Sequence, residues 1–176
     1  MASYDYQRSV RFLAEEDSAH LISCGQSAHA AFLYEVFFER AQREVGMLCK
    51  NFSRGAFGSE RVVRAFKGAV GRGVRFVAIS QETAGEDNPF VASLKQAAKD
   101  EPVSVTYREL GGDATEHEAK LRGFSENFCV VDRKAYRWEP DREKVGAIAC
   151  MNSPGTASSI SDLIWFFLDN IDPVKA

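Results

Sequence analysis

The sequence lacks long apolar runs, and we expect no secretory leader. No stretch approaches the roughly 18 consecutive apolar residues that a membrane-spanning helix needs, so we expect no membrane span. The first five residues do not show the basic-then-apolar order of a secretory signal, which predicts a cytoplasmic protein. Charged residues make up 27% of the chain and hydrophobic residues 45%, a balance that argues against wholesale disorder.

Cysteine and histidine are scarce and scattered. The cysteines show no Cys-x-x-Cys spacing, and the histidines are not paired with them at the short spacing of a zinc site, so we expect no metal and no cofactor. Three of the cysteines fall in apolar runs typical of strands, which predicts buried thiols. The residues concerned are Cys24, Cys49, Cys129 and Cys150, with His20, His29 and His117.

The length of the chain predicts one domain. A chain of 176 residues can bury one core and is too short for two ordinary domains, so we expect residues 1–176 to fold as a single unit. The net charge of −3 is unevenly spread within it, because residues 40–75 carry nine basic side chains and only two acidic ones. A chain polarised in this way can attract a polyanion to one surface.

The periodicity of apolar residues predicts alternating helices and strands. Helices are expected from Ser27, after the cap Ser59, from Pro89 and after Pro154. The N-terminal stretch fits either a short strand pair or a helix. Strands are expected at Val45–Cys49, Val74–Ile79, Val103–Tyr107, Asn127–Val131, Ala135–Trp138 and Val145–Cys150. This order predicts an α/β fold in which a mixed sheet carries helices on both faces.

Two helices carry more apolar surface than one contact should need. Apolar residues, Phe37 and Phe38 among them, cover about two-thirds of the helix from Ser27, and Trp165 and Phe166 flank the apolar stripe of the last helix. Such patches usually mark contacts, so we expect these four residues at a dimer interface. Alternatively, the first 25 residues cover them within one chain.

The segment 125–132 resembles the signature of the phospholipase D-like superfamily, which is His, one residue, Lys, four residues, Asp. Ser125 stands at the His position, Asn127 at the Lys position, and Asp132 is retained. A later segment, Ala147–Ser153, is similar to the Gly-Ser-x-Asn element of the family, with Asn152 as the candidate relic. The resemblance covers residues 27–171 as a single half of the fold, with residues 1–26 as an N-terminal extension.

The resemblance implies a chain without catalytic activity. In the family the His attacks phosphorus and the Lys neutralises phosphate oxygens, and Ser125 and Asn127 supply neither group. One motif copy per chain implies a homodimer, and the absence of both groups implies a binding or regulatory module with an unknown protein partner. Asp132 can also be explained as a turn residue and Asn152 as a helix cap.

Two other functions remain open at this stage. A nucleic-acid-binding protein would use the basic 40–75 region, in which a helix presents cations on one side that could instead form an ordinary solvated helix face. The cations of this expected anion-binding surface are Arg54, Arg61, Arg64, Lys67 and Arg72. A phosphodiesterase with a rearranged site would need Ser125 or His117 as its nucleophile, and neither has a partner base adjacent in sequence.

Overall fold

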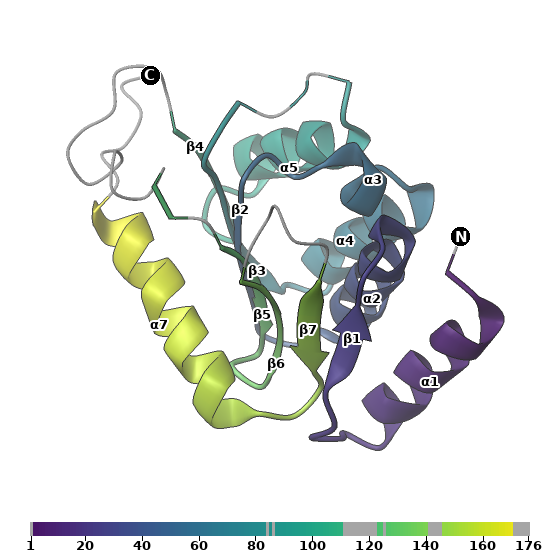
Figure 1. Ribbon diagram of the computed structural model, residues 1–176. Helices are drawn as coiled ribbons and strands as arrows, with labels where there is room; N and C mark the ends of the chain where they lie inside the picture. Colours follow the sequence, from purple (N-terminus) through teal and green to yellow (C-terminus); the bar gives the residue numbers. More distant parts are fainter. Residues whose placement is uncertain are drawn as a thin grey trace.

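Seven strands form one mixed sheet between two helical layers (Figure 1). The computed structural model describes residues 2–83, 85, 87–110, 123–124, 126–140 and 146–170. The strand order is β1-β7-β6-β5-β2-β3-β4, with β2, β3 and β4 parallel and the other neighbours antiparallel. The strands are β1 Ile22–Cys24, β2 Glu44–Cys49, β3 Arg75–Ser80, β4 Val105–Glu109, β5 Asn127–Val131, β6 Ala135–Glu139 and β7 Ala147–Cys150.

The helices divide unequally between the two faces of the sheet. One face carries α7 (Pro154–Asn170) and the other carries the remaining described helices (Figure 1). Those helices are α1 Tyr4–Glu15, α2 Ser27–Arg40, α3 Arg54–Phe57, α4 Glu60–Gly71 and α5 Pro89–Asp100. The predicted α/β architecture, with helices on both faces of a mixed sheet, is therefore confirmed. No described helix meets the length and apolarity that crossing a bilayer would demand.

Local side-chain caps explain where several helices begin. The Ser59 hydroxyl accepts a hydrogen bond from the Val62 amide at the start of α4, as the sequence predicts. Asn88 caps α5 by accepting from the Phe90 amide, and Pro89 occupies the first turn. The ambiguous N-terminal stretch contains the helix α1, capped by Ser3, and the edge strand β1.

The core consists of two layers, one on each face of the sheet. Between the sheet and α2, α4 and α5, the rings of Phe38, Phe66, Phe76 and Phe90 contact one another with centroid distances from 4.9 to 6.5 Å. On the other face, α7 packs Ile164 over Gly46 of β2. A Cβ atom at Gly46 would lie 3.1 Å from Val130 and 3.3 Å from Ile164, so this glycine permits the close approach of α7.

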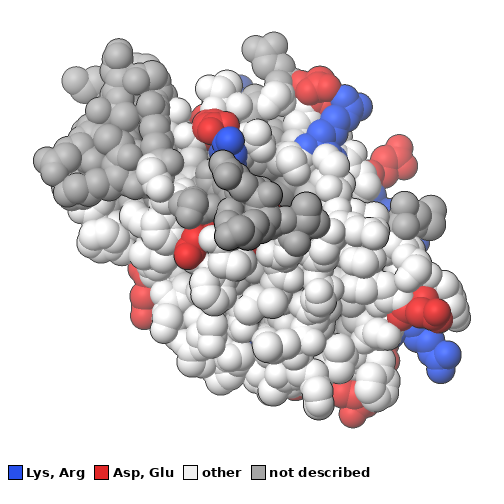
Figure 2. All heavy atoms as spheres, in the orientation of Figure 1, with Lys and Arg blue, Asp and Glu red and all other residues white. Residues whose placement is uncertain are grey.

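Charged atoms are sparse on one part of the surface. In Figure 2, the lower part of the visible face, over α7 and the strands beside it, is mostly uncharged, with acidic and basic side chains toward the rim. On α7 itself, Trp165 is half-buried and Phe166 is 56% exposed. The face shown in Figure 2 therefore contains a sparsely charged area.

Candidate functional site

A cavity of about 210 Å³ opens at the carboxyl end of β2. The segment between β1 and α2, the loop after β2, the start of β5 and the end of β6 meet around it. Antiparallel pairing places Asn127, the first residue of β5, opposite Glu139, the last of β6. The residues central to its chemistry are Tyr34, Cys49, Lys50, Asn127, Arg137 and Glu139.

Both ends of the Asn127 amide are engaged in the fold. Its Oδ1 accepts a hydrogen bond of 2.8 Å from the backbone N–H of Lys50, and its Nδ2 donates to Glu139 Oε2 at 2.8 Å. The amide therefore bridges the end of β2 to the end of β6. It carries no charge and cannot neutralise a phosphate as an ammonium group would.

Arg137 supplies the buried cation of the cavity, and the sequence reasoning missed it. The residue is 6% exposed, and its Nη1 donates to the Tyr34 hydroxyl at 3.1 Å and to Glu139 Oε2 at 3.4 Å. Its Nε has no hydrogen-bond partner in the structure. Burial opposes the charged guanidinium, but Tyr34, Cys24 and Glu139 outweigh it, so the pKa of Arg137 stays above its ordinary value.

Asp132 lies at the other end of β5 and serves the backbone. Its carboxylate accepts hydrogen bonds of 2.9, 2.8 and 2.9 Å from the amides of Gln42, Arg43 and Glu44. Together these bonds fix the connection between α2 and β2. Asn152 lies at the same end, where its Nδ2 donates to the Asp17 carbonyl at 3.1 Å. Neither side chain converges with Asn127.

Three solved structures are similar over most of this chain. A protein described as a phospholipase D family member, NUC from Salmonella typhimurium, has a TM-score of 0.59 at 14% identity, covering 89% of this chain and 99% of its own. NucT from Helicobacter pylori has a TM-score of 0.55 at 11% identity, covering 86% and 96%. TrmBL2, described as an archaeal chromatin protein with a novel mode of DNA binding, has a TM-score of 0.60 at 10% identity, covering 97% and 61%.

The chain has a phospholipase D-like fold. No family model and no curated protein matches the sequence itself. At identities of 10 to 14% the likeness concerns the fold alone. In this phospholipase D-like fold, Asn127 lines the cavity at the carboxyl end of β2, which we call the first cavity. Ser125 and His117 lie outside the described residues.

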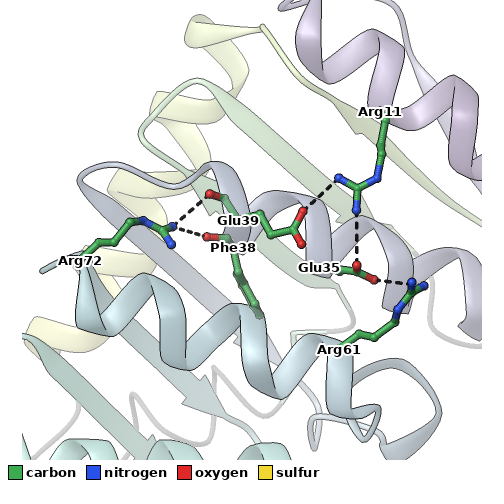
Figure 3. Close-up of polar contacts among 6 residues, drawn as sticks. All are labelled: Arg11, Glu35, Phe38, Glu39, Arg61 and Arg72. Atoms are coloured by element: carbon green, nitrogen blue, oxygen red, sulfur yellow. Dashed lines mark hydrogen bonds and ion pairs between the residues drawn. The ribbon is translucent and has the colours of Figure 1, made fainter.

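The predicted anion-binding surface of this phospholipase D-like chain does not form as one patch. Arg54 is paired with Asp87, and Arg61 Nη1 lies 3.8 Å from the buried Glu35 carboxylate. Arg72 is engaged within the fold, because its Nη2 donates to main-chain oxygens at the end of α2, at 2.8 Å to Phe38 and 3.1 Å to Glu39 (Figure 3). Such bonds satisfy helix carbonyls that would otherwise lack donors.

Two cations of that surface remain free. Arg64 and Lys67 are exposed on α4 and form no ion pair with any described residue. Two side chains one turn apart offer much less charge than the predicted five. Of the basic residues on and just after α4, Arg61 and Arg72 therefore hold this helix against α2.

The predicted interface residues separate into two groups. Phe37 and Phe38 are 2% and 0% exposed within the chain's own core, which leaves them little surface to offer a second chain. The physical reason is that α2 lies between the sheet, α4 and α1, with Arg11 of α1 placed 5.3 Å from the ring of Phe32. The N-terminal helix therefore covers α2, as the single-chain alternative predicts, while Phe166 remains exposed.

The remaining polar candidates do not assemble a metal centre. Within the described part of the chain, no three His, Cys, Asp or Glu side chains are grouped to hold a metal ion. All four cysteines are buried thiols, as the sequence predicts. His29 stacks on Tyr6 at 3.9 Å between ring centroids and so belongs to the contact between α2 and α1.

Proposed function

We propose that this chain is a phospholipase D-like domain that binds other molecules and does not hydrolyse phosphodiesters. The observation that carries the proposal is the state of Asn127, whose amide is uncharged and hydrogen-bonded at both ends. A group that is already committed to Lys50 and Glu139 cannot reorganise to hold a transferring phosphoryl group without breaking the contact between β2 and β6.

Arg137 is a poor substitute for the missing cation. Its charge faces the Glu139 carboxylate at 3.4 Å, and the second cation of the cavity, Lys50, lies 3.3 Å from Glu82. The Arg137 charge is therefore balanced by a partly buried carboxylate, whereas the exposed Lys50–Glu82 pair contributes little and can exchange for an anion.

The histidine nucleophile of the family is also absent from the described lining of the cavity, where the thiols of Cys24 and Cys49 are buried. Neither Ser27 nor Ser53 in that lining hydrogen-bonds to a carboxylate or imidazole among the described residues. A serine hydroxyl without such a base is a weak nucleophile. The likeness to TrmBL2, whose description gives it DNA binding, supports a binding role for this fold.

Hydrolysis assays test this proposal. The full chain is incubated with a bis-aryl phosphodiester and with single-stranded DNA, each with and without divalent metal, and release of product is followed. We expect no turnover above the buffer rate. Turnover by the full chain that Ser125→Ala or His117→Ala abolishes would overturn the proposal in favour of a rearranged phosphodiesterase. Asn152→Ala is the matched control, since Asn152 lies away from the first cavity.

We further propose that the exposed apolar surface of α7 contacts a second copy of the chain. Phe166 is 56% exposed there, and Trp165 packs against Arg75, whose guanidinium carbon lies 4.1 Å from the ring centroid. The sparsely charged area of the face shown in Figure 2 supports the pairing of two identical chains, because few like charges would oppose each other there.

Sedimentation velocity of the full chain tests the dimer. We expect the wild type to sediment as a dimer and Phe166→Glu as a monomer. Phe12→Glu is the matched control, because Phe12 is 59% exposed on α1, away from α7. A monomeric wild type, or equal dissociation by both substitutions, would show that α7 is not the interface.

A further inference from the structure

A second cavity, of about 490 Å³, lies at the opposite end of the central strands. The end of α1, the connection from α2 to β2, the turn between β5 and β6 and the loop before α7 surround it. The six residues of β2 lead from this cavity to the first one. Because a strand rises about 3.3 Å per residue, the two cavities are about 20 Å apart.

Four cations from two distant segments converge on this second cavity. Arg40 ends α2 and Arg43 lies in the connection to β2, whereas Arg133 and Lys134 come from the turn between β5 and β6. The acidic residues in the lining are Asp17 and Asp132, which leaves a formal excess of +2. About 90 residues of sequence separate the two pairs, so no local charge count could reveal the cluster.

The Asp132 carboxylate in this cavity is hydrogen-bonded to the backbone and not to the neighbouring guanidinium groups. Asp132 accepts three backbone N–H groups, and its carbonyl oxygen, not its carboxylate, accepts the 3.1 Å hydrogen bond from Arg43 Nη2. Arg40 is exposed and forms no ion pair with a described residue. Two guanidinium groups therefore keep unshared donors beside the cavity.

The other two cations are shared with single acids. Lys134 pairs with Asp17, and Arg133 pairs with Asp162 of α7. Both pairs are on the surface, where an ion pair contributes little to stability and can exchange for a stronger anion.

The turn that carries Arg133 and Lys134 adopts an unfavourable backbone. Asp132 and Arg133 have φ angles of 53° and 55°, a left-handed conformation that non-glycine residues seldom adopt. The Lys134 amide closes the turn on the Val131 carbonyl at 2.9 Å, which gives a two-residue type I′ turn. The bonds from Asp132 to the 42–44 backbone hold this geometry, and with it the two cations, beside Arg40 and Arg43.

We propose that the second cavity binds the phosphodiester backbone of a single-stranded nucleic acid. Guanidinium groups match phosphate oxygens with paired donors, and several such contacts add up along a polymer. The cations stand separately around an open cavity, an arrangement that suits successive phosphates better than one enclosed ion. The site is distinct from the first cavity and does not depend on whether that cavity hydrolyses anything.

Fluorescence anisotropy of a labelled oligonucleotide of about 12 nucleotides, titrated with the full chain, tests the proposal. We expect Arg40→Glu to weaken binding about tenfold at low salt. The salt dependence should become shallower by about 0.7 for each phosphate that the variant no longer neutralises. Lys67→Glu is the matched control, because Lys67 is also exposed and unpaired among the described residues but lies on α4. We expect it to change affinity by less than about twofold, since it would touch no phosphate.

Arg133→Gly removes a cation from the second cavity in a variant that we expect to fold as well as the wild type. Glycine adopts the left-handed backbone without strain, so this substitution removes the cation while easing the turn. We expect weaker binding without lower stability. No binding by the wild type at low salt, equal weakening by Arg40→Glu and Lys67→Glu, or unchanged affinity in Arg133→Gly would each overturn the proposal. So would complete displacement of the oligonucleotide by inorganic phosphate at matched ionic strength, since one small anion would then suffice.

Discussion

Arg11 of α1 reaches the buried carboxylate of Glu35 on α2, with 3.4 Å between Nη2 and Oε1 (Figure 3). The Glu35 side chain is only 6% exposed, and Arg61 of α4 approaches its other oxygen at 3.8 Å. A second contact, 3.0 Å from Arg11 to Glu39, lies at the surface. One carboxylate thus links three helices that are separate in sequence.

We expect Glu35→Gln to lower the free energy of unfolding by about 1 kcal/mol, because the neutral amide weakens two charge-assisted contacts that are partly screened by solvent. Urea denaturation followed by circular dichroism measures the change. Glu39→Gln is the control, since this more exposed partner of Arg11 should contribute less than about 0.5 kcal/mol. Equal destabilisation of the two variants would show that burial of Glu35 adds nothing.

We expect Asp132→Ala to destabilise the chain by about 3 kcal/mol, because three backbone N–H groups lose a charged acceptor. Asp132→Gly removes the same bonds but relieves the left-handed backbone, so it should be slightly more stable than the alanine variant. Asp132→Asn keeps one acceptor oxygen and should lie between these variants and the wild type. Denaturant midpoints give the ranking, and an alanine variant as stable as the wild type would contradict the role assigned to the carboxylate.

We expect Arg137→Ala to lower the free energy of unfolding by about 2–3 kcal/mol, because the Tyr34 hydroxyl and the partly buried Glu139 carboxylate lose their charged partner. Arg137→Met should cost less, since it keeps most of the buried volume while removing the same polar interactions. Thermal unfolding separates the two variants. If both were equally destabilised, the polar interactions alone would account for the effect.

We expect stability to fall as the pH rises above about 10, where tyrosines in the unfolded chain ionise. Burial raises the pKa of Tyr34 well above its ordinary value. The pKa of Tyr107 is raised as well, mainly by burial and secondly by its hydrogen bond to the Glu109 carboxylate. The folded state therefore retains neutral phenols when the unfolded state has released its protons. Urea denaturation across this range measures the slope, and Tyr34→Phe should make it shallower. An unchanged slope would exclude Tyr34 as a contributor.

Local sequence patterns predicted most of the fold. Ser59 and Asn88 mark helix starts by hydrogen bonds to amides two or three residues away, so their roles can be inferred from spacing. The short helix α3 was missed within its glycine-containing loop, because a single turn leaves no apolar period to detect.

The functional residues were harder to predict, since their roles depend on partners remote in sequence. Arg72 has the spacing of a solvated helix face, yet it binds carbonyls more than 30 residues earlier. Arg137 lies in a short strand where nothing nearby indicates its contact with Tyr34, 103 residues away. The apolar surplus of α2 was predicted correctly, but only the structure shows that α1 covers it.

The left-handed turn between β5 and β6 also bears on the order of events in folding. Two successive non-glycine residues in this conformation make a hairpin that is costly to form in isolation. Its compensating hydrogen bonds come from amides about 90 residues earlier, so a long loop must close before the hairpin gains them. The hairpin is thus expected to mature late, and the slow step should be the meeting of two remote segments rather than growth from a local nucleus.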